Sequence, residues 1–255
     1  MNRFFADTSV MAWRNLRRTL RLPEMVVFAT IQPVMFVVLF RYVFGGAIDT
    51  GSTSYVNFLM AGIFVQTVAF GSFGTALGLV DDLQRGVVDR FRSLPMNHGA
   101  VVLGRIINDI SINLISIIVM VIVGVIVGFR PTGSPLELLL GFGILVLVSF
   151  SFSWIGATIG LSLRTVEAVN SGGFLWMFPL TFVSSAFVPV DSMPGWLQGF
   201  AEYQPFTRMV DAVRALSLNQ PAADHVIASV LWCLAIIAVF LPISMRQFRR
   251  AALRA

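Results

Sequence analysis

Six long apolar runs, separated by shorter polar segments, dominate the hydrophobic pattern of this chain. A transmembrane helix needs about 20 consecutive, mostly apolar residues, and each run is close to that length or above it. The pattern therefore predicts an all-α membrane protein with six transmembrane helices, over residues 26–44, 55–80, 106–129, 136–161, 168–188 and 226–244.

The composition favours the same assignment. Hydrophobic residues make up 56% of the 255 residues and charged residues 12%, and the mean hydropathy is +0.82. A soluble domain carries about 25% charged residues. One helix bundle can use a whole chain of this length, so we expect residues 1–255 to form a single transmembrane domain.

The segment before the first apolar run, residues 1–22, has a helical pattern with one basic stripe. Arg14, Arg17, Arg18 and Arg21 are spaced at i, i+3, i+4 and i+7. This spacing is typical of an amphipathic helix that lies on the inner membrane surface with its arginines toward lipid phosphates. A solvated basic lead-in is the alternative.

The arginines also predict the orientation. All 18 basic residues are Arg, and cytoplasmic loops of membrane proteins carry the excess of basic residues. With a cytoplasmic N-terminus, fourteen arginines lie inside and only four, Arg41, Arg130, Arg208 and Arg214, lie outside. We therefore expect a multi-pass cell-membrane protein with both termini in the cytoplasm. Although the pI is 10.6, we expect no nucleic-acid partner because the arginines gather beside membrane spans.

Residues 81–105 form a charged cytoplasmic segment between two predicted spans. Val87, Val88, Phe91 and Leu94 share one helical face, polar residues fill the other, and Pro95 ends the helix. A short amphipathic helix in this position is suited to binding a soluble partner. A loop that rests on the inner leaflet is the alternative.

The outer segment, residues 189–221, has too much helical periodicity for a plain loop. Phe206, Val210 and Val213 repeat at helical spacing, and Asp211 lies on the opposite side with an arginine three residues away in each direction. We expect one or two interfacial helices that cap the outer face.

Polar groups within the predicted spans are mostly uncharged. Asp109 lies near the inner end of the third span and Glu137 at the outer start of the fourth, so the middle of each span has no carboxylate. The amides have two interpretations, namely hydrogen bonding between helices or the lining of a substrate path, and the second gives Gln32, Gln66, Asn113 and Asn170 as candidates.

The chain lacks the residue patterns of an enzyme. It has no G-x-x-x-x-G-K-[ST] phosphate loop, and His98, His225 and Cys233 are too scattered to form a metal site. An ion-driven transporter would need intramembrane carboxylates. We therefore expect that any uphill transport draws its energy from another chain.

Two motifs resemble those of a known family. Gly86-Val-Val-Asp-Arg-Phe-Arg-Ser-Leu-Pro-Met96, followed by Val101-Val-Leu-Gly-Arg105, closely resembles ABC-2 type permeases, especially the daunorubicin/doxorubicin resistance exporters. The outer segment resembles the same family through Pro189, Met193-Pro194-x-Trp196-Leu197, Gln204-Pro205-Phe206-Thr207 and Asp211-Ala-Val-Arg214-Ala-Leu216. The resemblance extends over nearly the whole chain.

The resemblance implies a half-transporter that pairs with a second permease subunit and two copies of a soluble ABC ATPase, which would bind ATP and magnesium. This chain would hold no cofactor. The region of Gly86–Leu94 would be the coupling helix, and the implied ATPase-coupling residues are Asp82, Arg85, Gly86, Val87, Asp89, Arg90, Phe91, Arg92 and Leu94. The outer segment would form a gate with Pro189, Pro194, Trp196, Leu197, Pro205, Asp211 and Arg214.

Many such permeases carry Glu where this chain has Asp82 or Gln84. The resemblance implies export of amphipathic drugs, natural products or lipids, although relatives of the same architecture export polar polymers. Two other functions stay open from the residues alone. One is an ATPase-independent channel or ion-coupled carrier, and the other is a membrane scaffold that transports nothing.

Overall fold

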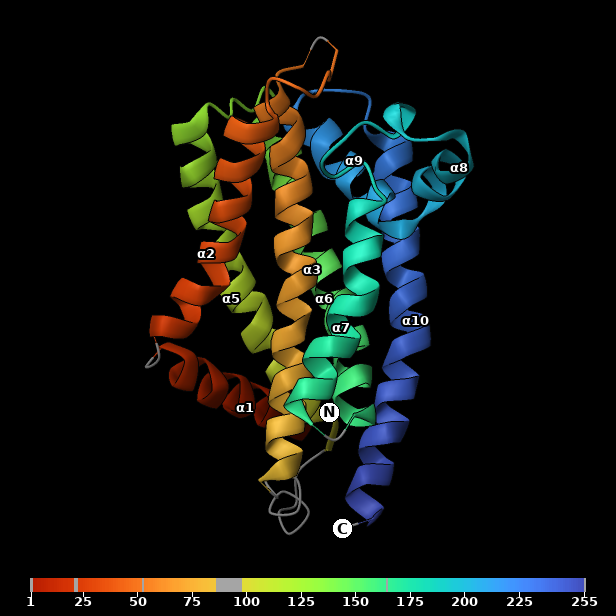
Figure 1. The fold of residues 1–255 in the computed structure, drawn as a ribbon. Coiled ribbons are helices and arrows are strands. Elements are labelled where there is room, and N and C mark those ends of the chain that lie inside the picture. The colour runs from red at the N-terminus through yellow and green to blue at the C-terminus, as the bar shows by residue number, and fades with distance from the viewer. Residues whose placement is uncertain (1, 21–22, 52, 86–97, 164, 255) are drawn as a thin grey trace.

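A computed structural model describes residues 2–20, 23–51, 53–85, 98–163 and 165–254. The protein is a bundle of long helices, and none of these described residues lies in a β-strand (Figure 1). The helices are α1 (Asn2–Leu20), α2 (Pro23–Leu39), the π-helix η1 (Phe40–Phe44), α3 (Tyr55–Gln84), α5 (His98–Val127), α6 (Pro135–Ser162), α7 (Val166–Phe182), the 3-10 helix η2 (Val190–Ser192), α8 (Gly195–Tyr203), α9 (Pro205–Ser217) and α10 (Ala223–Arg254).

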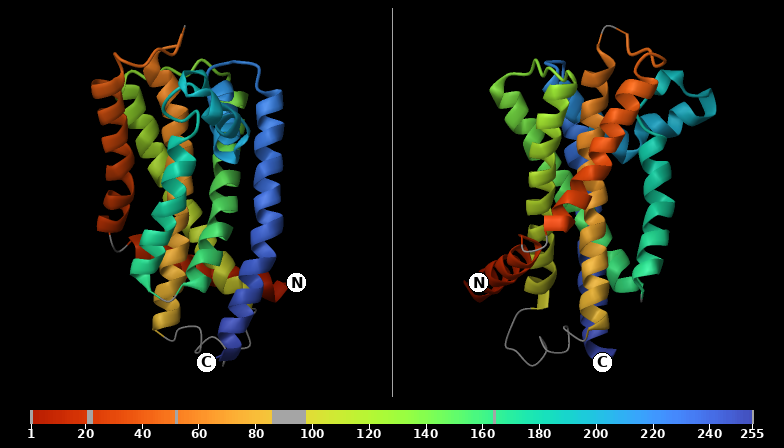
Figure 2. Two further views of the ribbon diagram at one scale, coloured as in Figure 1. Left: turned by 45° about the vertical axis from the view of Figure 1, so that its right-hand side comes forward. Right: turned by 60° about the vertical axis from the view of Figure 1, so that its left-hand side comes forward.

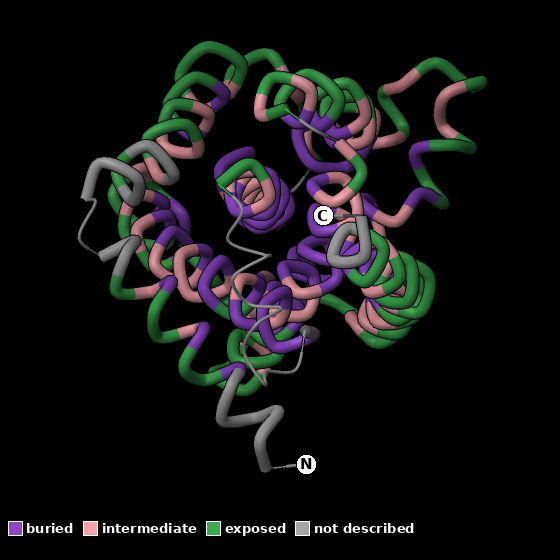
Figure 3. Tube along the Cα trace, turned by 90° about the horizontal axis from the view of Figure 1, so that it is seen from below, coloured by how far each residue is buried: buried purple, intermediate pink, exposed green. Residues whose placement is uncertain are grey.

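Helix α3 is the central element of the bundle. Viewed along the bundle, buried positions gather on α3 and on the faces of the helices around it (Figure 3). In its most apolar stretch, 72% of the residues are buried. A helix that is apolar on every side is covered by other helices or by lipid, and neighbouring helices cover most of this stretch of α3.

Glycines allow α6 to approach α3 closely. A Cβ atom on Gly156 would lie 2.3 Å from the Ser72 carbonyl oxygen, and one on Gly160 would lie 2.4 Å from that of Ala76. Both distances are shorter than any real carbon–oxygen contact. The Gly156-x-x-x-Gly160 spacing therefore sets the packing distance between the two helices.

Four helices are long and apolar enough to cross a membrane, at Tyr55–Gln84, Gly99–Val127, Pro135–Ser162 and Ala223–Arg250. The apolar helix at Thr30–Phe44 is shorter, and α7 has 17 residues. The sequence predicted that the α7 span continues to Val188. The helix stops at Phe182 because the chain turns there, where Ser184 Oγ accepts a hydrogen bond from the Ala186 N–H at 3.1 Å.

Helix α5 begins about two turns before the third predicted span. Helix α5 starts at His98, not at residue 106, so the segment between α3 and α5 is shorter than the predicted 81–105 loop. The first turns of α5 bury Val101 and Val102, and Gly104 lies against Met11 of α1. This packing extends the helix beyond the part that hydropathy marks as a membrane span.

Helix α1 runs across one end of the bundle instead of along it, and the C-terminal end of α10 lies at the same end (Figures 1 and 2). The helices α8 and α9 lie at the opposite end (Figure 1). Met11 and Asn15 of α1 are buried, whereas Trp13, Arg14 and Arg17 are exposed. The amphipathic helix predicted for residues 1–22 is thus present over Asn2–Leu20.

Candidate functional site

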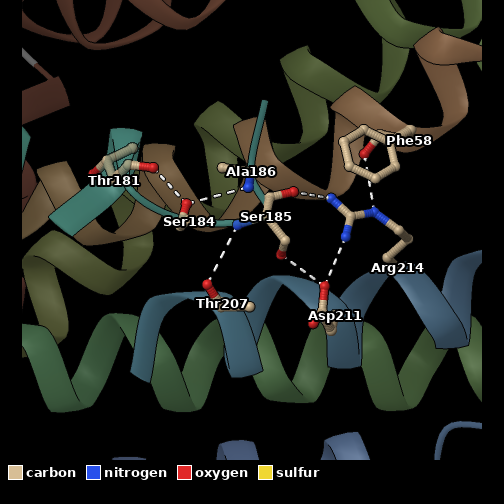
Figure 4. Close-up of polar contacts among 8 residues, drawn as sticks. All are labelled: Phe58, Thr181, Ser184, Ser185, Ala186, Thr207, Asp211 and Arg214. Atoms are coloured by element: carbon tan, nitrogen blue, oxygen red, sulfur yellow. Dashed lines mark hydrogen bonds and ion pairs between the residues drawn. The ribbon is translucent and has the colours of Figure 1, made fainter. Parts of the chain in front are cut away.

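A buried polar cluster lies where α9 meets α3 and the turn after α7 (Figure 4). Its centre is Arg214, of which only 8% is exposed. The guanidinium contacts Asp211 Oδ1 at 2.7 Å and donates hydrogen bonds to the carbonyl oxygens of Phe58, at 3.2 Å, and Ser185, at 2.5 Å. One side chain therefore joins α9, α3 and the turn.

The same turn is held by further side chains of α9. Ser185 Oγ donates to Asp211 Oδ1 at 2.7 Å, and the Ser185 N–H donates to Thr207 Oγ1 at 3.3 Å (Figure 4). Gln204, which precedes α9, donates to the carbonyl oxygens of Leu180 and Val183 at 2.9 and 2.5 Å. We call these four residues with Arg214 (Ser185, Gln204, Thr207, Asp211 and Arg214) the outer clasp.

The charge of Arg214 is fixed at neutral pH. Burial lowers the pKa of Arg214 to about 10, and the neighbouring Asp211 carboxylate works against that shift. The guanidinium therefore stays protonated. It also lies 3.7 Å from the centroid of the Phe58 ring, which is a cation–π contact. The arrangement can hold two helices and a turn together.

The predicted outer-gate residues fall into three groups. Asp211 and Arg214 are in the clasp, whereas Trp196 of α8 is 81% exposed and Pro194 is also exposed. Pro189, Leu197 and Pro205 are partly buried, and Pro205 is the first residue of α9. The sequence placed Arg214 on the polar side of an interfacial helix, but α9 turns that side inward, against α3 and the turn.

A cavity of about 220 Å³ lies among α2, α3 and α5. Three of the four predicted path residues, Gln32, Gln66 and Asn113, line it together. The fourth, Asn170, is exposed on α7 and is not part of the cavity. Asp109 also lines this space and is 3% exposed, so a carboxylate lies deeper in the bundle than the sequence suggested.

The polar side chains of α5 lie against glycines of α3. Gly71, Gly74 and Gly78 each leave room that a Cβ atom would fill, and these spaces hold Asn113, Asp109 and Arg105 respectively. Asn113 Nδ2 donates to Ser149 Oγ at 2.8 Å, and Arg105 Nη2 donates to the Gly74 carbonyl at 3.2 Å. These three glycines of α3 therefore accommodate polar groups of α5.

A family model described as ABC-2 type transporter matches residues 6–218 of this chain. The chain belongs to the ABC-2 type transporter family. The match extends from α1 through α9 and includes the outer clasp.

Curated relatives match this ABC-2 permease over most of its chain and most of their own length. The daunorubicin resistance ABC transporter permease protein DrrB1 of Streptomyces coeruleorubidus is 31% identical over 238 residues, which are 93% of this chain and 84% of the relative. The probable doxorubicin resistance ABC transporter permease protein DrrC of Mycobacterium tuberculosis is 27% identical, over 92% and 86%. The putative transport permease ycf38 of Cyanophora paradoxa is 27% identical, over 84% and 74%.

Because these relatives are ABC permease subunits, the ABC-2 permease is a transport component and not an enzyme, as the sequence indicated. Most of its predicted coupling residues, Gly86–Leu94, lie outside the described residues. Of the other two, Arg85 is exposed and pairs with Asp81 at 2.7 Å. Asp82 is buried because α3 continues to Gln84 and packs this residue inward, so it lies in the bundle and not on a free cytoplasmic helix.

Sequence reasoning missed several residues of the clasp. Ser185 contacts α9 through its hydroxyl, N–H and carbonyl groups, and Phe58, beside the clasp, contacts Arg214 through its carbonyl oxygen and its ring; neither residue belongs to a local pattern that predicts these contacts. Gln204 and Thr207 could have been found, because both belong to the Gln204-Pro205-Phe206-Thr207 motif through which the chain resembles the family.

Proposed function

We propose that this ABC-2 permease is the membrane-spanning subunit of an ATP-driven exporter, with six spans and both termini in the cytoplasm. Two permease subunits pair with two copies of a separate ABC ATPase, which binds ATP and magnesium. The observation that carries the proposal is the match to permease relatives over more than nine-tenths of the chain.

The distribution of arginines supports the proposed orientation. Helix α1 and the last turns of α10, both rich in arginine, lie at one end of the bundle (Figure 1). The four arginines counted as external lie in η1, in α9 and between α5 and α6. Exposed apolar residues along α5 and α10, such as Ile118, Ile126 and Leu231, suit contact with lipid or a second subunit.

Helix α3 gives the coupling segment a mechanical route to the outer clasp. Its last residue, Gln84, precedes the segment Gly86–Leu94, and Phe58 near its first turn accepts a hydrogen bond from Arg214. Thirty helical residues span about 45 Å. In the proposed mechanism the ATPase moves the coupling segment, and α3 transmits the displacement to the turn between α7 and α9.

The names of two relatives suggest the cargo. They refer to resistance to daunorubicin and to doxorubicin. We extend this to amphipathic drugs, natural products or lipids, because molecules that partition into the bilayer can enter such a bundle from the membrane.

Co-purification of the permease with its ATPase tests the proposal. Phe91→Asp places a charge on the apolar side of the coupling segment, and aromatic anchors carry much of the energy of an interface. We expect this variant to insert in the membrane but to lose the ATPase. The matched control, Phe200→Asp, changes an exposed residue of α8 at the other end and should leave binding unchanged. Undiminished ATPase binding by Phe91→Asp would refute the coupling role.

An ion-coupled carrier is the second candidate function, and Asp109 is the observation that favours it. A buried carboxylate on a cavity within the bundle is the group that proton- or sodium-coupled carriers use. Vesicles containing the permease alone distinguish the two functions. A carrier would move cargo along an ion gradient without nucleotide, whereas an ABC exporter needs its ATPase and ATP.

A further inference from the structure

The cavity among α2, α3 and α5 has an unusual lining for the interior of a membrane protein. Besides Gln32, Gln66 and Asn113, the lining includes Thr67 and Ser116, and Phe36 and Phe70 supply aromatic walls. Asp109 is the only charged residue among the described residues that line the cavity. The lining thus combines one carboxyl group, several neutral hydrogen-bonding groups and aromatic surface.

The Asp109 carboxylate is held in place and retains capacity to bind. Thr75 Oγ1 donates to one carboxylate oxygen and Asn108 Nδ2 donates to the other at 3.2 Å. A carboxylate can accept about four hydrogen bonds, so two donors do not saturate it. Arg105, one turn away on α5, directs its guanidinium to the Gly74 carbonyl and lies against Gly78, outside the cavity lining.

Gln66 points to a ligand independently of Asp109. It is 5% exposed and lines the cavity, yet its Nε2 has no hydrogen-bond partner among the residues that the structure describes. A buried amide without a partner is costly, and native proteins rarely leave one. A ligand oxygen in the cavity would accept this hydrogen bond.

We propose that this cavity binds the cationic amine of an amphipathic organic cation. The amine donates to Asp109, an oxygen of the ligand accepts from Gln66, and the apolar part begins against Phe36 and Phe70. The volume is below the roughly 300–1,000 Å³ of sites that enclose a drug-sized molecule, so the cavity takes the amine-bearing group alone. The proposal rests on the export function and assigns the site that binds the amine.

Binding of a fluorescent amine to the purified permease in lipid nanodiscs tests this proposal. The probe is dansylcadaverine, which joins an aromatic fluorophore to one primary amine, and the reference is its uncharged N-acetyl form. We expect the wild-type protein to bind the amine at least tenfold more tightly than the acetylated form. Asp109→Asn keeps the shape and an oxygen for Thr75, and it should abolish this preference. Asp191→Asn, on the exposed η2, should leave the preference unchanged.

A second variant keeps the test decisive if Asp109→Asn fails to fold. Gln66→Met removes the amide that would donate to the ligand oxygen and should weaken binding of the amine probe several-fold, which a purely structural role of Asp109 would not produce. Equal binding of the two probes by the wild-type protein would overturn the proposal, as would an unchanged preference in a folded Asp109→Asn protein. The assay contains no ATPase, so its result is independent of the co-purification test of the export function.

Discussion

Arg214 shows how one side chain can join three parts of the bundle. It pairs with Asp211 and donates to carbonyl oxygens of α3 and of the turn after α7, and its side chain is only 10% exposed. Asp211, at 22%, is more open to solvent. Removing one partner of such a pair leaves the other charge and two carbonyl oxygens without their donor.

We predict that Arg214→Met lowers the free energy of unfolding by about 3 kcal/mol or more, because breaking a buried ion pair costs about 3–5 kcal/mol. Denaturant titration in detergent micelles measures this change. Arg214→Lys keeps the charge but not the planar fork of donors, so it should recover only part of the loss.

Arg208→Met is the matched control, in the same helix. Arg208 is partly exposed and its guanidinium lies over the Tyr203 ring, 5.3 Å from the centroid. Its loss should cost less than about 1 kcal/mol. If Arg214→Met proved no more harmful than this control, the clasp would not be a stabilising element.

The position of the clasp residues in the sequence could be predicted better than their environment. The three-residue spacing correctly placed Asp211 and Arg214 within reach of each other. It could not reveal that this side faces inward, because burial of Arg214 depends on the turn at Ser185, 29 residues away in the sequence. For the same reason it left open whether Asp211 pairs with Arg208 or Arg214.

At the scale of helices, the contact between α3 and α6 can be tested with two glycine substitutions in α6. Gly160→Ala would place a Cβ atom 2.4 Å from the Ala76 carbonyl oxygen, a backbone atom that cannot rotate away. We expect a loss of about 1–3 kcal/mol, as for overpacking of a core, and this can be measured by thermal unfolding of the purified protein.

Gly143→Ala tests whether the effect depends on position. Gly143 lies in the same helix, is exposed, and has no atom within 4 Å of an added Cβ. Alanine is favoured over glycine in helices by about 0.5–1 kcal/mol, so this variant should be neutral or slightly more stable. Similar losses for the two variants would rule out the close approach of α6 to α3.

Helix ends were harder to predict than the helices themselves. Apolar runs marked α3, α5, α6 and α10 because each is longer than a soluble helix needs to be. Hydropathy does not register packing beyond the membrane span, so it missed the first turns of α5, which α1 covers. It also predicted that the α7 span continues to residue 188 instead of ending at Phe182, because residues 183–188 are mostly apolar although they form a turn.

At the scale of the whole molecule, the arrangement of α3 connects the two candidate regions. It carries Gly71 and Gly74 beside the cavity, meets Arg214 at one end, and leads into the coupling segment at the other. The sequence grouped Gln66 and Asn113 as path candidates by their polarity alone. That they share a cavity with Gln32, and Asn170 does not, depends on the rotation of each helix, which polarity does not specify.

The proposed orientation of the molecule can be tested with single cysteines. The natural Cys233 is fully buried, so the unmodified protein should give little background with a membrane-impermeant maleimide. Gly199→Cys, in α8, and Arg249→Cys, in α10, place exposed thiols at opposite ends of the bundle. We expect Gly199→Cys to react in intact cells and Arg249→Cys only after permeabilisation, because fourteen of the 18 arginines are assigned to the cytoplasmic side.

Labelling of Arg249→Cys in intact cells would place the C-terminus outside. The coupling segment would then lie on the side without ATP, and the export function could not hold.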